Sequence, residues 1–218
     1  MDLLKIETFP LGKLQCNCSL IYNEQTRESI IIDPGDDAEA LLNLIEERNL
    51  KVKMLLHTHA HFDHIGCSKE IKSKTNSLIA LHPGDKLLYK SLPMQCMMFG
   101  AKPNMPGKVD HWLEDNEEFS LNDNNLKSFL KTLTTPGHTT GSVSFYSEFF
   151  EEPILFSGDT LFQNSIGRTD LPGGDFNHIK KSIKERLYTL PDETKVITGH
   201  GPQTRIFEEK RNNPFVNI

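Results

Sequence analysis

The sequence lacks several features that mark specialised classes of protein. No apolar run approaches the roughly 20 residues that a membrane-spanning helix needs. The N-terminal segment carries Asp2 and Glu7 where a signal peptide has a basic start and an apolar stretch. Lys and Arg total 24 against 30 Asp and Glu, and this net charge of −6 argues against nucleic-acid binding. We therefore expect a soluble cytoplasmic protein with neither a membrane nor a nucleic-acid partner.

Cysteine is also scarce, and its spacing excludes the common cysteine sites. Cys16, Cys18, Cys67 and Cys96 include no Cys-x-x-Cys pair of the kind found in zinc ribbons and thioredoxin-like proteins. Cys16 and Cys18 are two residues apart in an expected strand, so their side chains are roughly parallel and poorly placed to form a disulfide. We expect reduced thiols that pack as small apolar side chains.

What the chain does contain is an alternation of strand-like and helical stretches without a low-complexity linker. Hydrophobic periodicity and turn residues predict strands at residues 3–9, 19–22, 29–33, 52–56, 78–81, 126–133, 142–146, 154–156 and 194–197. The same criteria predict helices at residues 36–48, 65–74, 84–92, 175–190 and 203–210. Two runs of strands, each ending in helices, predict a sandwich of two sheets with helices outside, in one domain spanning residues 1–218.

Histidine is concentrated in one short segment, since four of the nine histidines lie between His57 and His64. His59 and His61 are two residues apart, so in extended backbone their side chains point the same way. Asp63 and His64 are adjacent and are directed to another side of the turn. The segment therefore offers two clusters of ligands, which favours a two-metal site. Imidazole and carboxylate without thiolate suit zinc, iron or manganese.

Three more candidate ligands each follow an expected strand and have a glycine beside them. They are His138 in TPGHTTGS, Asp159 in FSGDT and His200 in TGHGP. Glycine permits tight turns, through which side chains from separate strand ends can converge. Alone, each would more often be structural, but their shared placement indicates one site.

These ordered motifs resemble a known family. IIDPG at residues 31–35, THAHFDHIG from Thr58, and the three motifs above are similar to those of the metallo-β-lactamase superfamily. SIGRTDLPGGD at residues 165–175 and NPF at residues 213–215 look like the single-domain, glyoxalase-II-like hydrolases related to hydroxyacylglutathione hydrolase. The resemblance covers nearly the whole chain. It implies an α+β fold, the αββα four-layer sandwich of two mixed sheets with helices on the outer faces.

The resemblance also implies two divalent metal ions per chain, with zinc the first expectation and iron or manganese as alternatives. The first ion would be held by His59, His61 and His138, the second by Asp63, His64 and His200, and Asp159 would bridge both. Asp33 would support the His59–His64 loop from behind the ligands, unless it is an ordinary turn residue at the end of a strand.

Such a site would hydrolyse an acyl bond. A hydroxide bridging the metals would attack the carbonyl, because a metal lowers the pKa of bound water to about 7. Asp63 would orient the hydroxide or accept its proton as a catalytic residue. A thioester fits well because its thiolate leaves without protonation. The substrate expected from the resemblance is S-lactoylglutathione or another S-acylglutathione.

Other functions remain open. A persulfide dioxygenase-like iron oxidoreductase would share the fold and the GRTD-like loop, although His200 in GHG favours a second metal and hydrolysis. The bond cleaved could instead belong to another ester, a lactone or a β-lactam. A metal-stabilised module without activity is disfavoured, because all seven expected ligands are present.

Substrate contacts and oligomeric state are the least determined. Only 18 residues follow His200, so we expect no added helical region of the kind that grips glutathione in glyoxalase II. Arg168 could bind an anionic substrate group, although an ion pair with Asp170 is favoured. The Met-rich residues 93–107 could form part of the core, a lid or a dimer contact. The protein could be a monomer or a homodimer.

Four histidines are left outside the expected site. They are His57, His82, His111 and His178, and for all four a structural or surface role is favoured.

Overall fold

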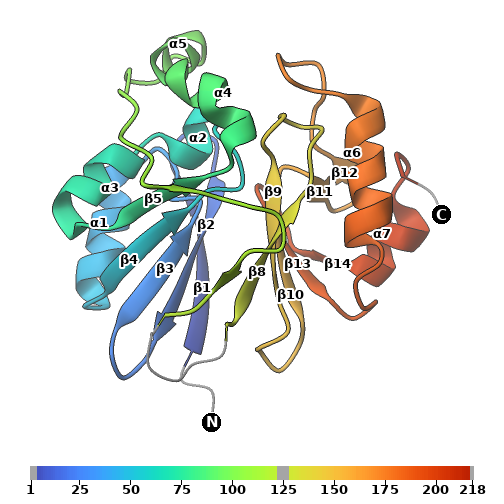
Figure 1. Cartoon of the computed structure of the whole chain (residues 1–218), viewed down its shortest axis with the longest axis horizontal. Coiled ribbons are helices and arrows are strands. Elements are labelled where there is room, and N and C mark those ends of the chain that lie inside the picture. Colours follow the sequence, from blue (N-terminus) through green and yellow to red (C-terminus); the bar gives the residue numbers. More distant parts are fainter. Residues whose placement is uncertain (1–3, 122–127, 217–218) are drawn as a thin grey trace. The chain divides into compact units, whose positions relative to one another are not determined.

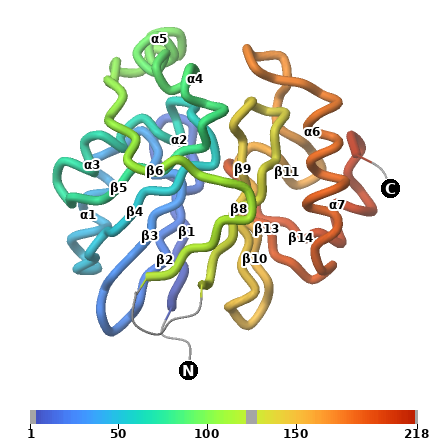
Figure 2. The backbone as a smooth tube through the Cα atoms, viewed as in Figure 1, coloured from blue at the N-terminus to red at the C-terminus, as the bar shows by residue number. Residues whose placement is uncertain are grey.

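The computed structural model describes residues 4–121 and 128–216, and the chain divides into two compact units, Met1–Trp112 and Leu113–Ile218. Each unit contains one six-stranded sheet, and helices pack on each sheet (Figure 1). Figure 2 traces the backbone from the blue N-terminal strands to the red C-terminal helix. The expectation of one domain over residues 1–218 stays a prediction.

The sheet of the first unit is mixed. Its strands, in spatial order, are β1 (Leu4–Leu11), β2 (Cys16–Asn23), β3 (Glu28–Ile32), β4 (Lys51–Leu56), β5 (Leu78–Leu81) and β6 (His111–Trp112). The first three strands pair antiparallel and the later ones pair parallel. Parallel neighbours need a crossover connection. Helix α1 (Ala38–Glu47) supplies it between β3 and β4, and α3 (Ser68–Thr75) supplies it between β4 and β5.

Helix α1 illustrates why the expected elements form. The Asp37 side chain accepts a hydrogen bond from the Ala40 amide and so caps the first turn, which is why the helix begins after the expected residue 36. Leu41 and Ile45 are four residues apart on one face and are buried. They belong to the same apolar core as Ile31 of β3, so burial of this face holds the helix on the sheet.

The expected helix at residues 65–74 is in fact two helices, α2 (Phe62–Ile65) and α3. The break occurs because the Cys67 amide donates to the Gly35 carbonyl, 3.0 Å away, instead of continuing the helical pattern. This contact ties the start of α3 to the Pro34–Gly35 turn after β3. The expected helix at residues 84–92 is likewise a short 3₁₀ turn, η1 (Pro83–Asp85), followed by α4 (Lys86–Lys90).

The Met-rich segment differs most from expectation. No helix or strand was predicted within residues 93–107, but Leu92–Met98 forms helix α5. Pro93 lies in its first turn, where a missing amide hydrogen costs no helical hydrogen bond. Met94, Met97 and Met98 are 65%, 69% and 74% exposed, so they are not core residues.

The sheet of the second unit is also mixed. Its spatial order is β14 (Thr204–Arg205), β13 (Lys195–Thr198), β10 (Ile154–Gly158), β9 (Val143–Ser147), β8 (Leu130–Thr134) and β7 (Glu118–Phe119). Only β10 and β13 pair in parallel. A small hairpin, β11 (Leu161–Phe162) and β12 (Ser165–Ile166), follows β10. The expected strand at residues 126–133 begins at Leu130; residues 126 and 127 lie outside the described part of the chain.

Two helices pack on this second sheet. Helix α6 (Phe176–Ser182) continues into a π-helical turn, η2 (Ile183–Leu187), and α7 (Ile206–Asn212) follows β14. Ile179, Ile183 and Ile206 are fully buried in one core cluster with Leu155 and Val196 of the sheet. Each unit therefore has its own apolar core, as two mixed sheets with associated helices require.

The four cysteines are buried and free, as the sequence predicts. Burial raises the pKa of the Cys16 thiol to about 12. Burial also raises the pKa of Cys18 and of Cys67 well above the usual value for a thiol. These thiols are therefore protonated at neutral pH.

Within residues 4–121 and 128–216, no helix combines the length and apolar character that crossing a bilayer would require.

A polar cluster around Glu7 ties β1, β2 and the end of α1 together. The Glu7 carboxylate accepts hydrogen bonds from Arg48 Nε at 2.6 Å and Tyr22 Oη at 2.8 Å, and it pairs with Lys5 Nζ at 3.0 Å. Burial alone would raise the pKa of Glu7, but the hydrogen bonds from Arg48, Tyr22 and Lys5 outweigh it and lower the pKa to about 2. The folded protein therefore favours the ionised carboxylate.

This cluster predicts an acid-sensitive contribution to stability. Because the pKa of Glu7 falls on folding, its contribution is complete above pH 4.5 and is lost as the pH falls towards 2. After allowance for solvent screening, we expect Glu7→Gln to cost about 1–2 kcal/mol of unfolding free energy at pH 7. Urea unfolding should show a smaller difference in unfolding free energy between the wild-type protein and Glu7→Gln at pH 3 than at pH 7. The exposed Glu24→Gln serves as the control. An equal difference at both pH values would contradict this account.

Candidate metal centre

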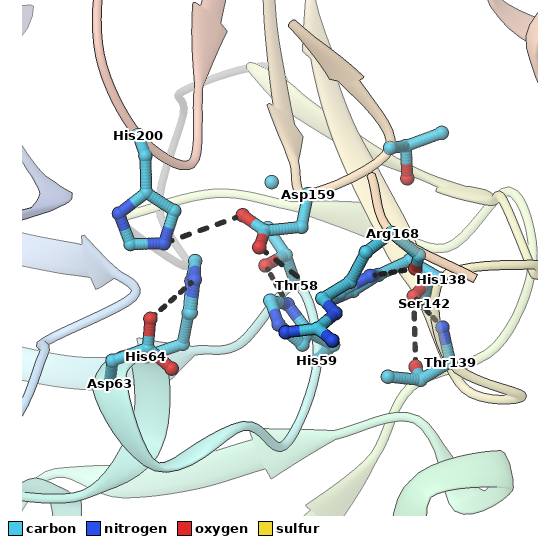
Figure 3. A network of polar contacts seen from close by, with 12 residues as sticks. Thr58, His59, Asp63, His64, His138, Thr139, Ser142, Asp159, Arg168 and His200 are labelled. Carbon is cyan, nitrogen blue, oxygen red and sulfur yellow. Dashed lines mark hydrogen bonds and ion pairs between the residues drawn. The ribbon is translucent and has the colours of Figure 1, made fainter. Parts of the chain in front are cut away.

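The four candidate ligands of the first unit lie together after the end of β4. His59 and His61 precede α2, and Asp63 and His64 belong to that helix. The His59 ring centroid lies 4.8 Å from that of His61 and 4.1 Å from that of His64. His64 Nε2 is 3.7 Å from Asp63 Oδ2 (Figure 3). His59, Asp63 and His64 are buried, and His61 is partly exposed.

Asp33 supports this loop through three contacts. Its Oδ1 accepts a hydrogen bond from the Thr58 amide at 2.8 Å, and its Oδ2 accepts one from the Thr58 hydroxyl at 2.7 Å. The same Oδ2 lies 3.0 Å from His64 Nδ1. Asp33 stands at the end of β3 with φ of 51°, a left-handed conformation that Asp tolerates better than most residues. This turn directs its carboxylate at the His59–His64 loop.

These contacts also determine which histidine nitrogens are available. A carboxylate only accepts, so His64 Nδ1 carries the hydrogen that it donates to Asp33. The Thr58 hydroxyl donates its own hydrogen to Asp33. It therefore accepts a hydrogen bond from His59 Nδ1, 3.0 Å away. In the neutral form of both rings the lone pair therefore lies on Nε2, which is the form a metal requires. Metal-binding histidines typically donate their other N–H in this way.

The three candidate ligands of the second unit also lie together, with Asp159 between two histidines. Asp159 Oδ2 is 3.5 Å from His138 Nε2, and Asp159 Oδ1 is 3.7 Å from His200 Nε2 (Figure 3). His138 Nδ1 donates to the Arg168 carbonyl at 2.8 Å, so in the neutral ring the lone pair lies on Nε2. Both histidines thus direct Nε2 to opposite oxygens of one carboxylate.

Close backbone packing produces this arrangement. The Gly199 amide donates to the Gly158 carbonyl at 2.9 Å, which joins the end of β13 to the end of β10 and places His200 beside Asp159. A Cβ on Gly167 would lie 1.8 Å from the Asp159 carbonyl oxygen, so only glycine fits there. Gly137 is equally constrained, because a Cβ would lie 2.2 Å from the Ile179 amide nitrogen of α6.

The donor chemistry of both sets fits divalent metal ions. Imidazole Nε2 atoms and carboxylate oxygens suit zinc, iron and manganese, and the described ligands include no thiolate. Cys16 Sγ does lie 3.4 Å from His64 Nδ1, but this is the nitrogen that faces Asp33. Which ion each residue binds, the catalytic role of Asp63 and the bridging role of Asp159 stay predictions.

Arg168 forms the ion pair favoured from the sequence. Its Nε and its terminal nitrogen donate to the two carboxylate oxygens of Asp170 at 2.8 and 2.7 Å. Both side chains are more than half exposed. The Arg168 carbonyl orients His138, so this residue supports the site through its backbone. Substrate binding by its guanidinium stays a prediction.

The remaining histidines lie outside these ligand sets. His57 is fully buried; it donates from Nδ1 to the Ala80 carbonyl at 2.8 Å, and its Nε2 accepts from Ser68 Oγ at 2.7 Å. Burial lowers the pKa of His57 to about 4, so it is neutral and structural. His82 accepts from the Gly84 amide at the start of η1, His111 is in β6, and His178 is exposed in α6.

Two residues that the sequence analysis did not single out contact the ligand loop. Asp85 of η1 accepts a hydrogen bond from the Ala60 amide, and Gln95 of α5 bonds to Ala60 and Phe62. No local motif marks either residue, because their partners are 25 to 35 positions away in the chain.

Comparisons with known proteins assign the family. Residues 11–200 match the model of the metallo-β-lactamase superfamily. The chain is 41% identical to the hydroxyacylglutathione hydrolase GloC of Haemophilus influenzae, over 98% of this chain and 99% of that protein. Among solved structures, it is similar to the BLEG-1 B3 metallo-β-lactamase (TM-score 0.86, 38% identity, covering 97% and 99% of the two chains). It is also similar to TTHA1623 in a di-iron-bound form (TM-score 0.85, 35% identity, covering 96% and 100%). The predicted α+β fold with two mixed sheets is confirmed, and the chain belongs to the metallo-β-lactamase superfamily.

Proposed function

We propose that the protein is a dinuclear metallohydrolase that cleaves a thioester, with S-lactoylglutathione or another S-acylglutathione as substrate. The observation that carries the proposal is the set of seven histidine and aspartate candidate ligands, which lie in segments that follow strand ends. Family membership supports a metallo-hydrolase, and the 41% identity to a protein named hydroxyacylglutathione hydrolase supports the substrate class. We also propose a cytoplasmic location.

The proposed centre uses all seven candidate ligands. One ion would be held by His59, His61 and His138. The other would be held by Asp63, His64 and His200, and Asp159 would bind both ions. When bound, two such ions supply the Lewis acidity that makes water a nucleophile near neutral pH and polarises a carbonyl group. Zinc is the first expectation, and iron is supported by the similar protein solved in a di-iron-bound form.

The chain's own groups have defined tasks in this reaction. The Asp63 carboxylate would accept the proton of the attacking water, because it is a buried base beside His64. Asp33 and Thr58 would keep His59 and His64 in the tautomer that binds metal. The leaving group is a thiolate, which needs no proton from a general acid, so no further acid is required.

Removal and return of metal tests this proposal. The protein stripped with a chelator should lose hydrolysis of S-lactoylglutathione, measured by release of the thiol. Zinc or iron should restore hydrolysis as the metal content approaches two equivalents per chain. Absence of hydrolysis with either metal would reject the thioesterase assignment.

A β-lactam is the second candidate substrate, because a similar solved structure is named a B3 metallo-β-lactamase. An iron oxidoreductase of the persulfide dioxygenase type is the third. The same metal-loaded samples should therefore be assayed with a β-lactam and, for oxygen uptake, with glutathione persulfide. If the protein turns over the β-lactam or glutathione persulfide faster than the thioester, the thioester is not its substrate.

A further inference from the structure

The backbone between His59 and His61 is held by side chains instead of by a neighbouring strand. β4 ends at Leu56, so the following residues leave the ladder and their buried amides and carbonyls need other partners. The Ala60 amide donates to Asp85 Oδ2 at 2.9 Å, and the Ala60 carbonyl accepts from Gln95 Nε2 at 3.2 Å. The Phe62 amide donates to Gln95 Oε1 at 3.1 Å.

These hydrogen bonds fall on particular peptide groups. The peptide group before His61 contains the Ala60 carbonyl, and the one after it contains the Phe62 amide. The single side-chain amide of Gln95 therefore binds both peptide groups that flank His61 and restricts the φ and ψ of that residue. Asp85 binds the peptide group that follows His59. Together they fix the two backbone positions from which these imidazoles project.

From this geometry we propose that Gln95 and Asp85 are positioning residues, which hold His59 and His61 in the orientation that binds metal. The inference rests on the proposed metal centre. Neither side chain is itself an expected ligand; each acts through the backbone. A metal site requires its ligands to be held within about 0.5 Å and 10–20° of the correct geometry.

The surroundings of Gln95 and Asp85 are rigid enough for this role. Gln95 is 8% exposed and Asp85 is fully buried. Gln95 Nε2 also donates to the Leu88 carbonyl at 2.8 Å, which fixes the amide against α4. The Phe62 ring stacks on Phe99 directly after α5, with ring centroids 5.1 Å apart. Lys13 Nζ in turn donates to the Phe99 carbonyl at 2.8 Å, so the end of α5 is anchored to the β1–β2 turn.

The two faces of α5 therefore differ in role. Its inner face presents Gln95 and Cys96 to the protein interior, while Met94, Met97 and Met98 are exposed. In Figure 2, α4 and α5 lie next to α2, which follows directly after the His59–His61 segment. The Met-rich segment, for which core, a lid and a dimer contact were the expected alternatives, thus has a further role on the inner face of α5.

The test compares metal binding by Gln95→Leu with that of the wild-type protein. The leucine cannot hydrogen-bond, so the peptide groups flanking His61 lose this restraint. We expect metal affinity, measured by competition with a chromophoric chelator, to fall about 10-fold or more. The visible absorption spectrum of the cobalt(II)-loaded protein should also change. For the proposed thioesterase, kcat should fall while KM changes little, because Gln95 is buried and acts through the backbone of the ligand loop.

Asn23→Leu is the matched control. Asn23 is a buried side-chain amide in the same unit, and its Oδ1 accepts from the Gln25 and Thr26 amides at 2.9 Å in the β2–β3 turn. Its loss should destabilise the fold without altering metal affinity or the cobalt spectrum. If Gln95→Leu lowers only the melting temperature, as Asn23→Leu should, Gln95 is merely structural and the inference is wrong.

A pair of Asp85 variants tests the same positioning role if Gln95→Leu does not fold. Asp85→Asn keeps an oxygen that can accept from the Ala60 amide, so it should retain tighter metal binding than Asp85→Ala. Equal metal affinity of these two variants would overturn the inference. If the wild-type protein itself binds no metal, the proposed function fails; if it binds metal and all variants match it, only this inference fails.

Discussion

Asp159→Asn is expected to reduce thioester hydrolysis by roughly 10²–10⁴-fold, because metal ions contribute several kcal/mol to charge stabilisation in such reactions. The Asp159 carboxylate lies 3.5 Å from His138 Nε2 and 3.7 Å from His200 Nε2, so its two oxygens face different ligands. Asparagine has the same shape but only one oxygen and no charge. It cannot offer an anionic oxygen to each of two ions.

Metal analysis should accompany the kinetics of Asp159→Asn. We expect the metal content to fall from two equivalents per chain towards one, with kcat/KM measured on S-lactoylglutathione. Asp192→Asn is a suitable control, because this exposed aspartate of the same unit pairs with Lys210 at 2.6 Å, away from the ligands. Two retained equivalents with unchanged kcat/KM would exclude a bridging role for Asp159.

Asp33→Asn should weaken metal binding by about 10–100-fold, the usual effect of losing a residue that orients metal ligands. Asp33 accepts from the Thr58 amide, the Thr58 hydroxyl and His64 Nδ1. An asparagine presents an NH₂ group in place of one oxygen, so at least one of these donors would face another donor. His64, and His59 through Thr58, would then lose the tautomer that leaves Nε2 unprotonated.

A comparison with Thr58→Val separates the two branches of this network. Valine has a similar shape but no hydroxyl, so only the contact to His59 Nδ1 and one contact to Asp33 are lost. We expect Thr58→Val to weaken metal binding less than Asp33→Asn, by chelator competition at constant pH. Wild-type affinity in Asp33→Asn would show that the carboxylate does not control the histidine tautomers.

Most of the fold and the candidate ligands could be predicted from the sequence because both depend on local patterns. Apolar periodicity located β3, α1 and β4, and glycine next to His138, Asp159 and His200 located the turns after strands. The break between α2 and α3 was not predictable, because it depends on a hydrogen bond from Cys67 to Gly35, far apart in the chain. Helix α5 was not predicted; Pro93 is compatible with it because proline is tolerated in the first turn of a helix.

The residues that orient the ligands were harder to predict than the ligands themselves. Metal ligands come from a few residue types, here histidine and aspartate, so residue type and spacing point to them. A positioning residue such as Gln95 needs only an amide at the right place, and that place is determined by tertiary packing. Asp33 was predicted only through the family resemblance, which identified IIDPG as a motif.

The burial of all four cysteines has a consequence for the proposed reaction, which would release a thiol. Thiol–disulfide exchange requires an accessible thiolate, but burial keeps Cys16, Cys18 and Cys67 protonated at neutral pH. Glutathione formed by the proposed reaction, and its disulfide, would therefore not form mixed disulfides with the folded chain. Activity would be independent of the cellular ratio of thiol to disulfide, and thiol-modifying reagents would report only on unfolding.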